Sequence, residues 1–146
     1  MQPNFLNIIG LMTGTSMDGI DISLVRTNGQ SLKRLNKNYF HKYSPDTKKY
    51  LMNILKQDVS FNLKRKQYLD EFVTNEHYLA LKDLDIVDSC DLIGFHGQTI
   101  YHNPQDKISI QLGDPKKLAK LLKKDVVFDF RSNDLALGGQ GAPLAP

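Results

Sequence analysis

The stretch that most constrains this chain runs from Ile8 to Val25, where a short apolar run enters a tight turn and an alternating run leaves it. The turn, residues 13–19, holds two glycines, three hydroxyl side chains and one carboxylate. Glycine lets backbone approach a ligand, consecutive amides in a turn form an anion-binding nest, and hydroxyls donate to phosphate oxygens. A carboxylate can hold a hydrated Mg²⁺. The pattern predicts a strand, a phosphate-binding loop and a returning strand; a polar β-turn that binds nothing is the alternative.

Three antiparallel strands are predicted to open the chain. Residues 8–12 are continuously apolar, which is typical of a strand buried on both faces. In residues 20–25 a large aliphatic side chain recurs at every second position, which indicates a half-buried strand. Asn28-Gly29 is a strong turn signal, and it returns the chain into a third strand around residues 38–43.

Helices and further strands follow. Ser44-Pro45-Asp46 is a helix start, and a longer helical pattern covers residues 62–84, with His77 at the surface or its boundary. Later elements are a strand at 92–95, a hairpin whose return strand is 108–112, a helix that starts at 113–115 and a last strand at 126–130. The order β-β-β-α-α-β-(β-hairpin)-α-β implies a mixed α/β sheet with helices on its faces.

The end of the chain, residues 131–146, is expected to be a long loop. It is rich in glycine and stops with the apolar Leu144 and Ala145 still in need of cover. We therefore expect either a truncated chain or one lobe of something larger.

Composition narrows the classes of function. The net charge of +3 is mild, and 40% of the residues are hydrophobic, which is enough for a core. Lys and Arg are spread through helix-like segments, with no basic stripe among aromatics, so solvated helix faces explain them better than a nucleic-acid partner. No signal peptide and no membrane span is apparent, so we expect a cytoplasmic protein without a membrane partner. Cys90 is the only cysteine and is expected to be a small buried residue.

Two further groups of polar residues follow predicted strands. His96 comes directly after the strand at 92–95, and it could hydrogen-bond a sugar, act as an acid or base, or be tied to backbone carbonyls in a turn. Arg131 follows the last strand and could clamp a carboxylate or phosphate, or pair internally with Asp129 or Asp134. His41 and His102 are expected to be structural or exposed.

No Walker A motif or Rossmann fingerprint is present. Taken jointly, however, the motifs resemble the anhydro-N-acetylmuramic acid kinases in order and spacing. The resemblance rests on Gly10-x-Met12-Thr13-Gly14-Thr15-Ser16-Met17-Asp18-Gly19-Ile20-Asp21, Gly94-Phe95-His96-Gly97-Gln98-Thr99, Gln111-Leu112-Gly113-Asp114, and Asp129-Phe130-Arg131-x-x-Asp134-x-Ala136-x-Gly138-Gly139-Gln140-Gly141-Ala142-Pro143-Leu144. It spans essentially the whole chain, and residues 44–90 diverge most.

The resemblance implies a fold and a reaction. Members of that family have the actin-like, sugar-kinase ATPase fold, in which two lobes each carry a ribonuclease-H-like core (β-β-β-α-β-α-β) and ATP lies between them. Residues 1–146 would then be an incomplete N-terminal lobe, with the C-terminal lobe absent. The family phosphorylates 1,6-anhydro-N-acetylmuramic acid at O6 while water opens the anhydro bond, which gives N-acetylmuramic acid 6-phosphate and ADP in bacterial cell-wall recycling.

The resemblance also assigns site residues. The ATP-phosphate segment would be Gly14, Thr15, Ser16, Met17, Asp18, Gly19, Ile20 and Asp21, with Asp18 also holding Mg²⁺ through water. The sugar side would be lined by His96, Gln98, Thr99, Arg131 and Asp134.

No catalytic residue can be named from this chain. The family's base is an Asp in an Asp-Thr-Gly-Pro-Gly-Asn type motif, which would lie beyond Pro146, and Asp18, Asp129 and Asp134 do not match it. Expected partners are ATP and a small sugar, and a homodimer stays open. Two alternatives remain, a non-catalytic remnant that binds phosphate or sugar weakly and a different sugar kinase of the same fold.

Overall fold

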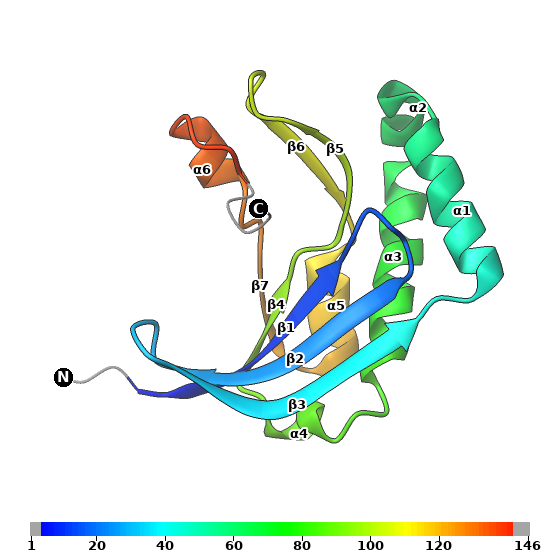
Figure 1. Ribbon diagram of the computed structural model, residues 1–146. Helices are drawn as coiled ribbons and strands as arrows, with labels where there is room; N and C mark the ends of the chain where they lie inside the picture. The colour runs from blue at the N-terminus through cyan, green and yellow to red at the C-terminus, as the bar shows by residue number, and fades with distance from the viewer. Residues whose placement is uncertain (1–3, 142–146) are drawn as a thin grey trace.

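A five-stranded mixed sheet forms the centre of the molecule (Figure 1). The computed structural model describes residues 4–141. The strands stand in the order β3-β2-β1-β4-β7, with β1 and β2 antiparallel, β2 and β3 antiparallel, and β4 and β7 parallel to β1. Their bounds are β1 Leu6–Thr13, β2 Gly19–Thr27, β3 Leu32–Lys42, β4 Leu92–Phe95 and β7 Asp125–Phe128. A separate antiparallel hairpin pairs β5 (Gln98–Asn103) with β6 (Ile108–Leu112).

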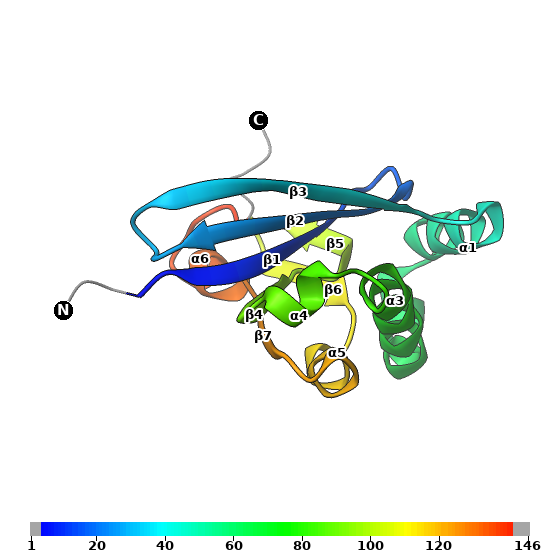
Figure 2. The same cartoon turned by 90° about the horizontal axis from the view of Figure 1, so that it is seen from below.

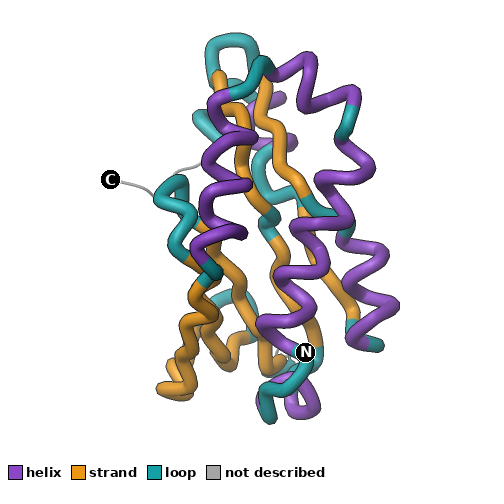
Figure 3. Tube along the Cα trace, turned by 90° about the vertical axis from the view of Figure 1, so that its right-hand side faces the viewer, coloured by secondary structure: helices purple, strands orange, loops and turns teal. Residues whose placement is uncertain are grey.

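Helices lie along one face of this sheet. Figure 2 shows α3, α4 and α5 on the same side of β1, β2 and β3, and Figure 3 shows the longer helices in front of the strands. The bounds are α1 Pro45–Lys56, α2 Val59–Lys64, α3 Lys66–Leu81, α4 Ile86–Ser89, α5 Pro115–Leu122 and α6 Ser132–Ala136. The predicted helix start at Ser44 is confirmed, because its side chain accepts from the Thr47 amide at 3.0 Å. Asp114 caps α5 in the same way through the Lys117 amide.

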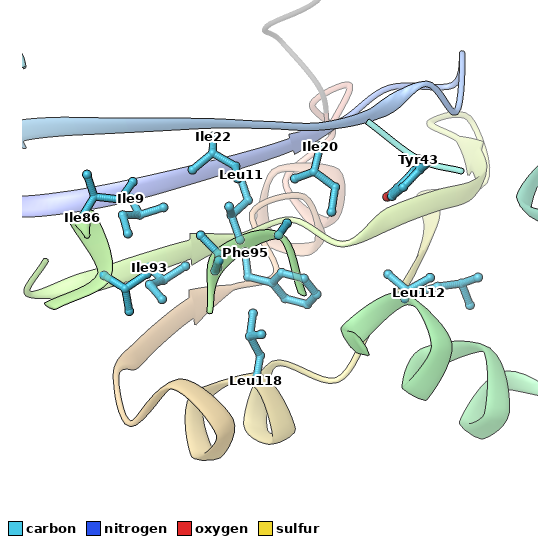
Figure 4. Packing of buried hydrophobic residues seen from close by; sticks show 14 of the residues in the cluster. Ile9, Leu11, Ile20, Ile22, Tyr43, Ile86, Ile93, Phe95, Leu112 and Leu118 are labelled. Carbon is cyan, nitrogen blue, oxygen red and sulfur yellow. The ribbon is translucent and has the colours of Figure 1, made fainter. Parts of the chain in front are cut away.

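The core fills the space between the sheet and these helices. Alternate residues of β1 and β2, among them Ile9, Ile20 and Ile22, are almost fully buried, as the two-residue period of the second strand predicted. Figure 4 shows Phe95 of β4 and Leu118 of α5 pointing toward one another across this space. Cys90 is buried, which confirms its prediction as a small core residue.

Three expectations about the elements were wrong. β1 is not buried on both faces: Ile9 is 0% exposed but Met12 is 55% exposed, because the described helices cover only one face of the sheet. The helix expected over residues 62–84 is split at Arg65 into α2 and α3. His77 is not at the surface but is 1% exposed, because it lies four residues after the buried Val73 and shares its helix face.

The predicted terminal loop contains a short helix, α6, whose first amide, that of Ser132, donates to the Asp129 carboxylate. The expectation about Leu144 and Ala145 lies outside the described residues. The strand order and the helix placement are those of a ribonuclease-H-like core, as the resemblance implied. Over residues 4–141, no helix is both long and apolar enough to cross a membrane.

Candidate functional site

Three segments with predicted functional residues meet at one edge of the sheet. β1, β4 and β7 are parallel, and in their register Leu11 stands beside Phe95, which stands beside Phe128. The chain that leaves these strands forms the loop at 14–18, the turn at 96–97 and the segment 129–131. Open α/β sheets bind ligands outside the carboxyl ends of their strands. The topology therefore brings the predicted phosphate loop, His96 and Arg131 to the edge where a ligand is expected.

The loop after β1 is a tight turn that is anchored in the core by one apolar side chain. The Met17 amide donates to the Gly14 carbonyl at 3.3 Å, and the Met17 side chain is 1% exposed in the core. Thr15 and Ser16 are exposed, and within residues 4–141 no group accepts from their backbone amides. The loop thus presents two backbone amides and the Thr15 hydroxyl to solvent, which suits an anion.

The second half of the predicted ATP segment has mixed roles. A Cβ on Gly19 would lie 2.2 Å from the His41 carbonyl oxygen, so this position requires glycine for the close pairing of β2 with β3. Ile20 is 0% exposed and belongs to the core. Asp21 is exposed on the face of the sheet opposite the helices. Met17 and Ile20 therefore anchor the loop from inside, and the exposed polar groups come from Thr15, Ser16, Asp18 and Asp21.

Asp18 is an exposed carboxylate with a cationic partner. Its Oδ1 accepts from the Lys48 ammonium of α1, a contact that the sequence analysis did not foresee. This hydrogen bond, followed by one from the Ser16 hydroxyl, holds the pKa of Asp18 below its usual value. Within residues 4–141 no three His, Cys, Asp or Glu side chains are grouped to hold a metal ion. A single carboxylate fits Mg²⁺ that is bound mainly by phosphates and water, which is how this ion commonly binds with nucleotides.

His96 has both ring nitrogens engaged. Its Nε2 is 2.7 Å from Nε of Arg131, and its Nδ1 is 3.0 Å from the Gly97 carbonyl oxygen. Because an arginine Nε can only donate, Nε2 accepts and the proton sits on Nδ1. Burial lowers the pKa of His96, and the positive charge of Arg131 lowers it further. His96 is therefore a neutral ring that orients Arg131. Its predicted hydrogen bond to a backbone carbonyl is present, and the bond from Arg131 is a second contact at the other ring nitrogen.

Arg131 makes no ion pair with a carboxylate among the described residues. The predicted internal pair with Asp129 or Asp134 does not form. Asp129 accepts from the amide and hydroxyl of Ser132, and Asp134 accepts from the Gly141 amide at 2.7 Å. Besides His96, the guanidinium approaches Nδ1 of His102 at 3.4 Å through its Nη1. An arginine whose charge has no carboxylate partner at this edge can take an anionic group of a ligand.

A cavity of about 200 Å³ opens beside this arginine. Its walls combine aromatic side chains with the polar heads of His96 and Arg131, a mixture that suits a sugar ring with polar substituents. It is lined by Phe95, His96, Gln111, Leu112, Gly113, Pro115, Phe128, Asp129, Phe130 and Arg131.

The other predicted sugar-side residues stand outside the cavity lining. Gln98 is 1% exposed, its Nε2 donates to the Thr99 carbonyl at 3.3 Å, and within residues 4–141 no donor reaches its Oε1. The Thr99 hydroxyl accepts from Gln111 at 3.4 Å. Asp134 holds the glycine-rich turn that ends at Gly141. The structure therefore brings His96 and Arg131 together but not Gln98, Thr99 or Asp134.

Sequence reasoning missed three contributors. Lys48 belongs to a helix whose pattern gave no hint of the loop. His102, which was expected to be structural or exposed, is exposed on β5 and lies within 3.4 Å of Arg131, which is 29 residues later in the chain. Phe130 lines the cavity wall, and its place one residue before Arg131 was the only available signal.

Comparisons with known proteins show which family the chain belongs to. A family described as "Anhydro-N-acetylmuramic acid kinase" matches residues 6–146. An "Anhydro-N-acetylmuramic acid kinase" of Pelagibacter ubique (strain HTCC1062) is 41% identical over 97% of this chain and 40% of its own length. Proteins of the same name from Rhodopseudomonas palustris (strain ATCC BAA-98 / CGA009) and Agrobacterium fabrum (strain C58 / ATCC 33970) are 38% and 40% identical, over 97% and 94% of the chain. This chain spans only about 40% of the length of these relatives. On the extent of these matches, the chain belongs to the anhydro-N-acetylmuramic acid kinase family.

Proposed function

We propose that this chain is the N-terminal lobe of a two-lobed, ATP-dependent kinase that acts on 1,6-anhydro-N-acetylmuramic acid. The observation that carries the proposal is the meeting, at one sheet edge, of two features: a loop with exposed amide and hydroxyl groups, and an arginine that has no carboxylate partner within residues 4–141. The loop suits the phosphates of ATP, and the arginine suits the carboxylate of an acidic sugar. Family membership selects the reaction among those that such an edge could support.

On the nucleotide side, the amides and hydroxyls of Thr15 and Ser16 bind the β- and γ-phosphates. The exposure of both residues supports this role, as do their two backbone amides, which have no acceptor within residues 4–141. Asp18 would hold Mg²⁺ through water, and the metal would neutralise charge on the transferred phosphoryl group. Lys48 pairs with the same carboxylate and would contribute positive charge beside the bound phosphates.

On the sugar side, Arg131 binds the carboxylate of the muramic acid, with its Nε edge fixed by His96. The sugar ring occupies the neighbouring cavity against Phe130. Water adds across the anhydro bond at the anomeric carbon, O6 is released and takes the γ-phosphoryl group, and ADP leaves. The base that deprotonates this water comes from the second lobe, because no carboxylate of this chain matches the family's base.

The setting follows from the reaction. The enzyme would work in the bacterial cytoplasm on amino sugars recovered from the cell wall, with ATP and the sugar as partners and without nucleic acid or membrane. A homodimer is compatible with this proposal. The competing functions are a different sugar kinase of the same fold and a non-catalytic remnant.

The test is product identification with the full-length product of the gene, Mg²⁺ and ATP. We expect ADP release with the anhydro sugar and a product heavier than that substrate by one phosphoryl group plus one water. Turnover only of N-acetylmuramic acid or N-acetylglucosamine would replace this proposal by the different sugar kinase. If no sugar is turned over, the non-catalytic remnant is the alternative that remains. As a control on the sugar side, Arg131→Gln should raise the KM for the sugar, whereas Arg26→Gln on the exposed part of β2 should not.

A further inference from the structure

One carbonyl oxygen joins the two halves of the candidate site. The Gly97 oxygen accepts from Nδ1 of His96 at 3.0 Å and also from the hydroxyl of Thr13 at 2.9 Å. Thr13 is the last residue of β1 and directly precedes the phosphate loop. His96 in turn accepts from Arg131 at 2.7 Å. A continuous set of hydrogen bonds therefore runs from the base of the loop to the guanidinium.

The shared carbonyl is held rigidly. Gly97 has a φ of +71°, and a Cβ at that position would lie 2.3 Å from the Leu112 carbonyl oxygen. The peptide is thus packed directly against the end of β6, so it cannot shift without moving the hairpin. Thr13 is 6% exposed, so its hydroxyl is shielded from water and the bond to Gly97 is not readily exchanged for a solvent contact.

We propose that Thr13 is a positioning residue that fixes Arg131, through Gly97 and His96, relative to the phosphate loop. This inference rests on the proposed function. In that function Thr13 sets the distance between the γ-phosphoryl group and Arg131, which binds the carboxylate of the sugar. Catalysis of phosphoryl transfer is mostly positioning, and a small misplacement of bound groups costs a large factor in rate. Thr13 itself touches neither substrate.

The kinetic test uses Thr13→Val in the full-length gene product, because valine keeps the shape and removes the donor. We expect kcat to fall by about ten- to a hundredfold and the KM for the anhydro sugar to rise. Thr13→Ser, which retains the hydroxyl, should restore most of both. Thr13→Ala also removes the hydroxyl donor, and its side chain is smaller. It therefore tests the loss of the hydrogen bond even if valine does not pack well at this position.

The matched control is Thr27→Val at the end of β2. The Thr27 hydroxyl also bridges two backbone groups, donating to the Ser31 carbonyl at 2.7 Å and accepting from the Gly29 amide at 3.1 Å. Thr27 lies at the end of β2 away from the phosphate loop, so the loss of its hydroxyl should leave the KM for the sugar unchanged. Kinetics of Thr13→Val that match those of Thr27→Val, once corrected for folded protein, would overturn the inference.

A second readout is independent of the reaction. The hydrogen bond from Arg131 Nε to His96 should give a slowly exchanging Nε–H resonance in nitrogen-15 NMR, identified by its disappearance in His96→Ala. We expect Thr13→Val and Thr13→Ala to speed its exchange, and Thr27→Val to leave it unchanged. If the wild-type enzyme phosphorylates no sugar while this pattern holds, the proposed function fails and the positioning contact stands. If the resonance is indifferent to Thr13, the positioning role fails.

Discussion

At the scale of single residues, Met17 explains how a polar turn becomes a defined loop. It has a φ of +52°, a left-handed conformation that costs an L-residue about 1–2 kcal/mol. Full burial of a methionine side chain stabilises by roughly 1.5–3 kcal/mol, which offsets that cost. The apolar residue in the middle of the turn therefore fixes the backbone on which Thr15 and Ser16 present their donors. The sequence indicated the donors but not the anchor, because nothing in the pattern showed which way Met17 faces.

His77 gives a prediction about acid stability. Its pKa is lowered to about 4, mainly by burial and less by the nearby His41 and His96, while the hydrogen bond with the Val73 carbonyl opposes the shift. The folded chain thus binds this proton less readily than the unfolded chain, whose histidine titrates near pH 6.5. The contribution of His77 to the free energy of unfolding is fully present above about pH 6.5 and is lost as the pH falls toward about 4. From about pH 7 to about pH 5, we expect this group to remove about 2 kcal/mol from the free energy of unfolding.

The measurement is urea unfolding of wild type and His77→Leu at both pH values. The leucine variant should lose less stability on acidification, whatever its stability at neutral pH. His102→Gln, which removes an exposed histidine, controls for the loss of a histidine as such. Equal pH dependence in wild type and His77→Leu would show that the buried ring is not the acid-sensitive group.

At the scale of elements, the strands and helix caps could be predicted from local sequence, whereas the burial of the two faces of β1 could not. The alternation in β2, the Ser44 cap and the β5–β6 hairpin each depend on residues close in sequence, so they could be predicted. Burial of β1 depends on what covers each face, which is a tertiary property. For the same reason the sequence placed His96 and Arg131 on adjoining strand ends but could not show that one orients the other.

The junction between β4 and β5 carries the element-scale prediction. Gly97→Ala places a Cβ against the Leu112 carbonyl at a positive φ, so it should destabilise the chain by about 1–3 kcal/mol and displace the hairpin. Gly10→Ala is the matched control, because a Cβ there meets nothing within 4 Å. Chemical denaturation of both variants measures the difference. A Gly97→Ala variant as stable as Gly10→Ala would contradict the rigid junction on which the link from Thr13 to His96 depends.

At the scale of the whole molecule, one face of the sheet is left uncovered by the described residues. Met12 of β1 and Phe40 of β3 are both at least half exposed, at 55% and 53%. Large exposed apolar side chains of this kind mark surfaces that another segment or partner covers. The chain also spans only about 40% of the length of its relatives. Both observations support the proposal that these residues form one half of a two-lobed enzyme.

The most direct test compares the purified 146-residue chain with the full-length product of its gene. The measurement is ATP-dependent phosphorylation of the anhydro sugar by each protein at equal concentration. We predict no product from the chain alone and product from the full-length protein, because in the proposed function the second lobe supplies the water-activating base. Turnover by the chain alone would show that the second lobe is not needed, and a gene with no second lobe downstream would contradict the two-lobed kinase altogether.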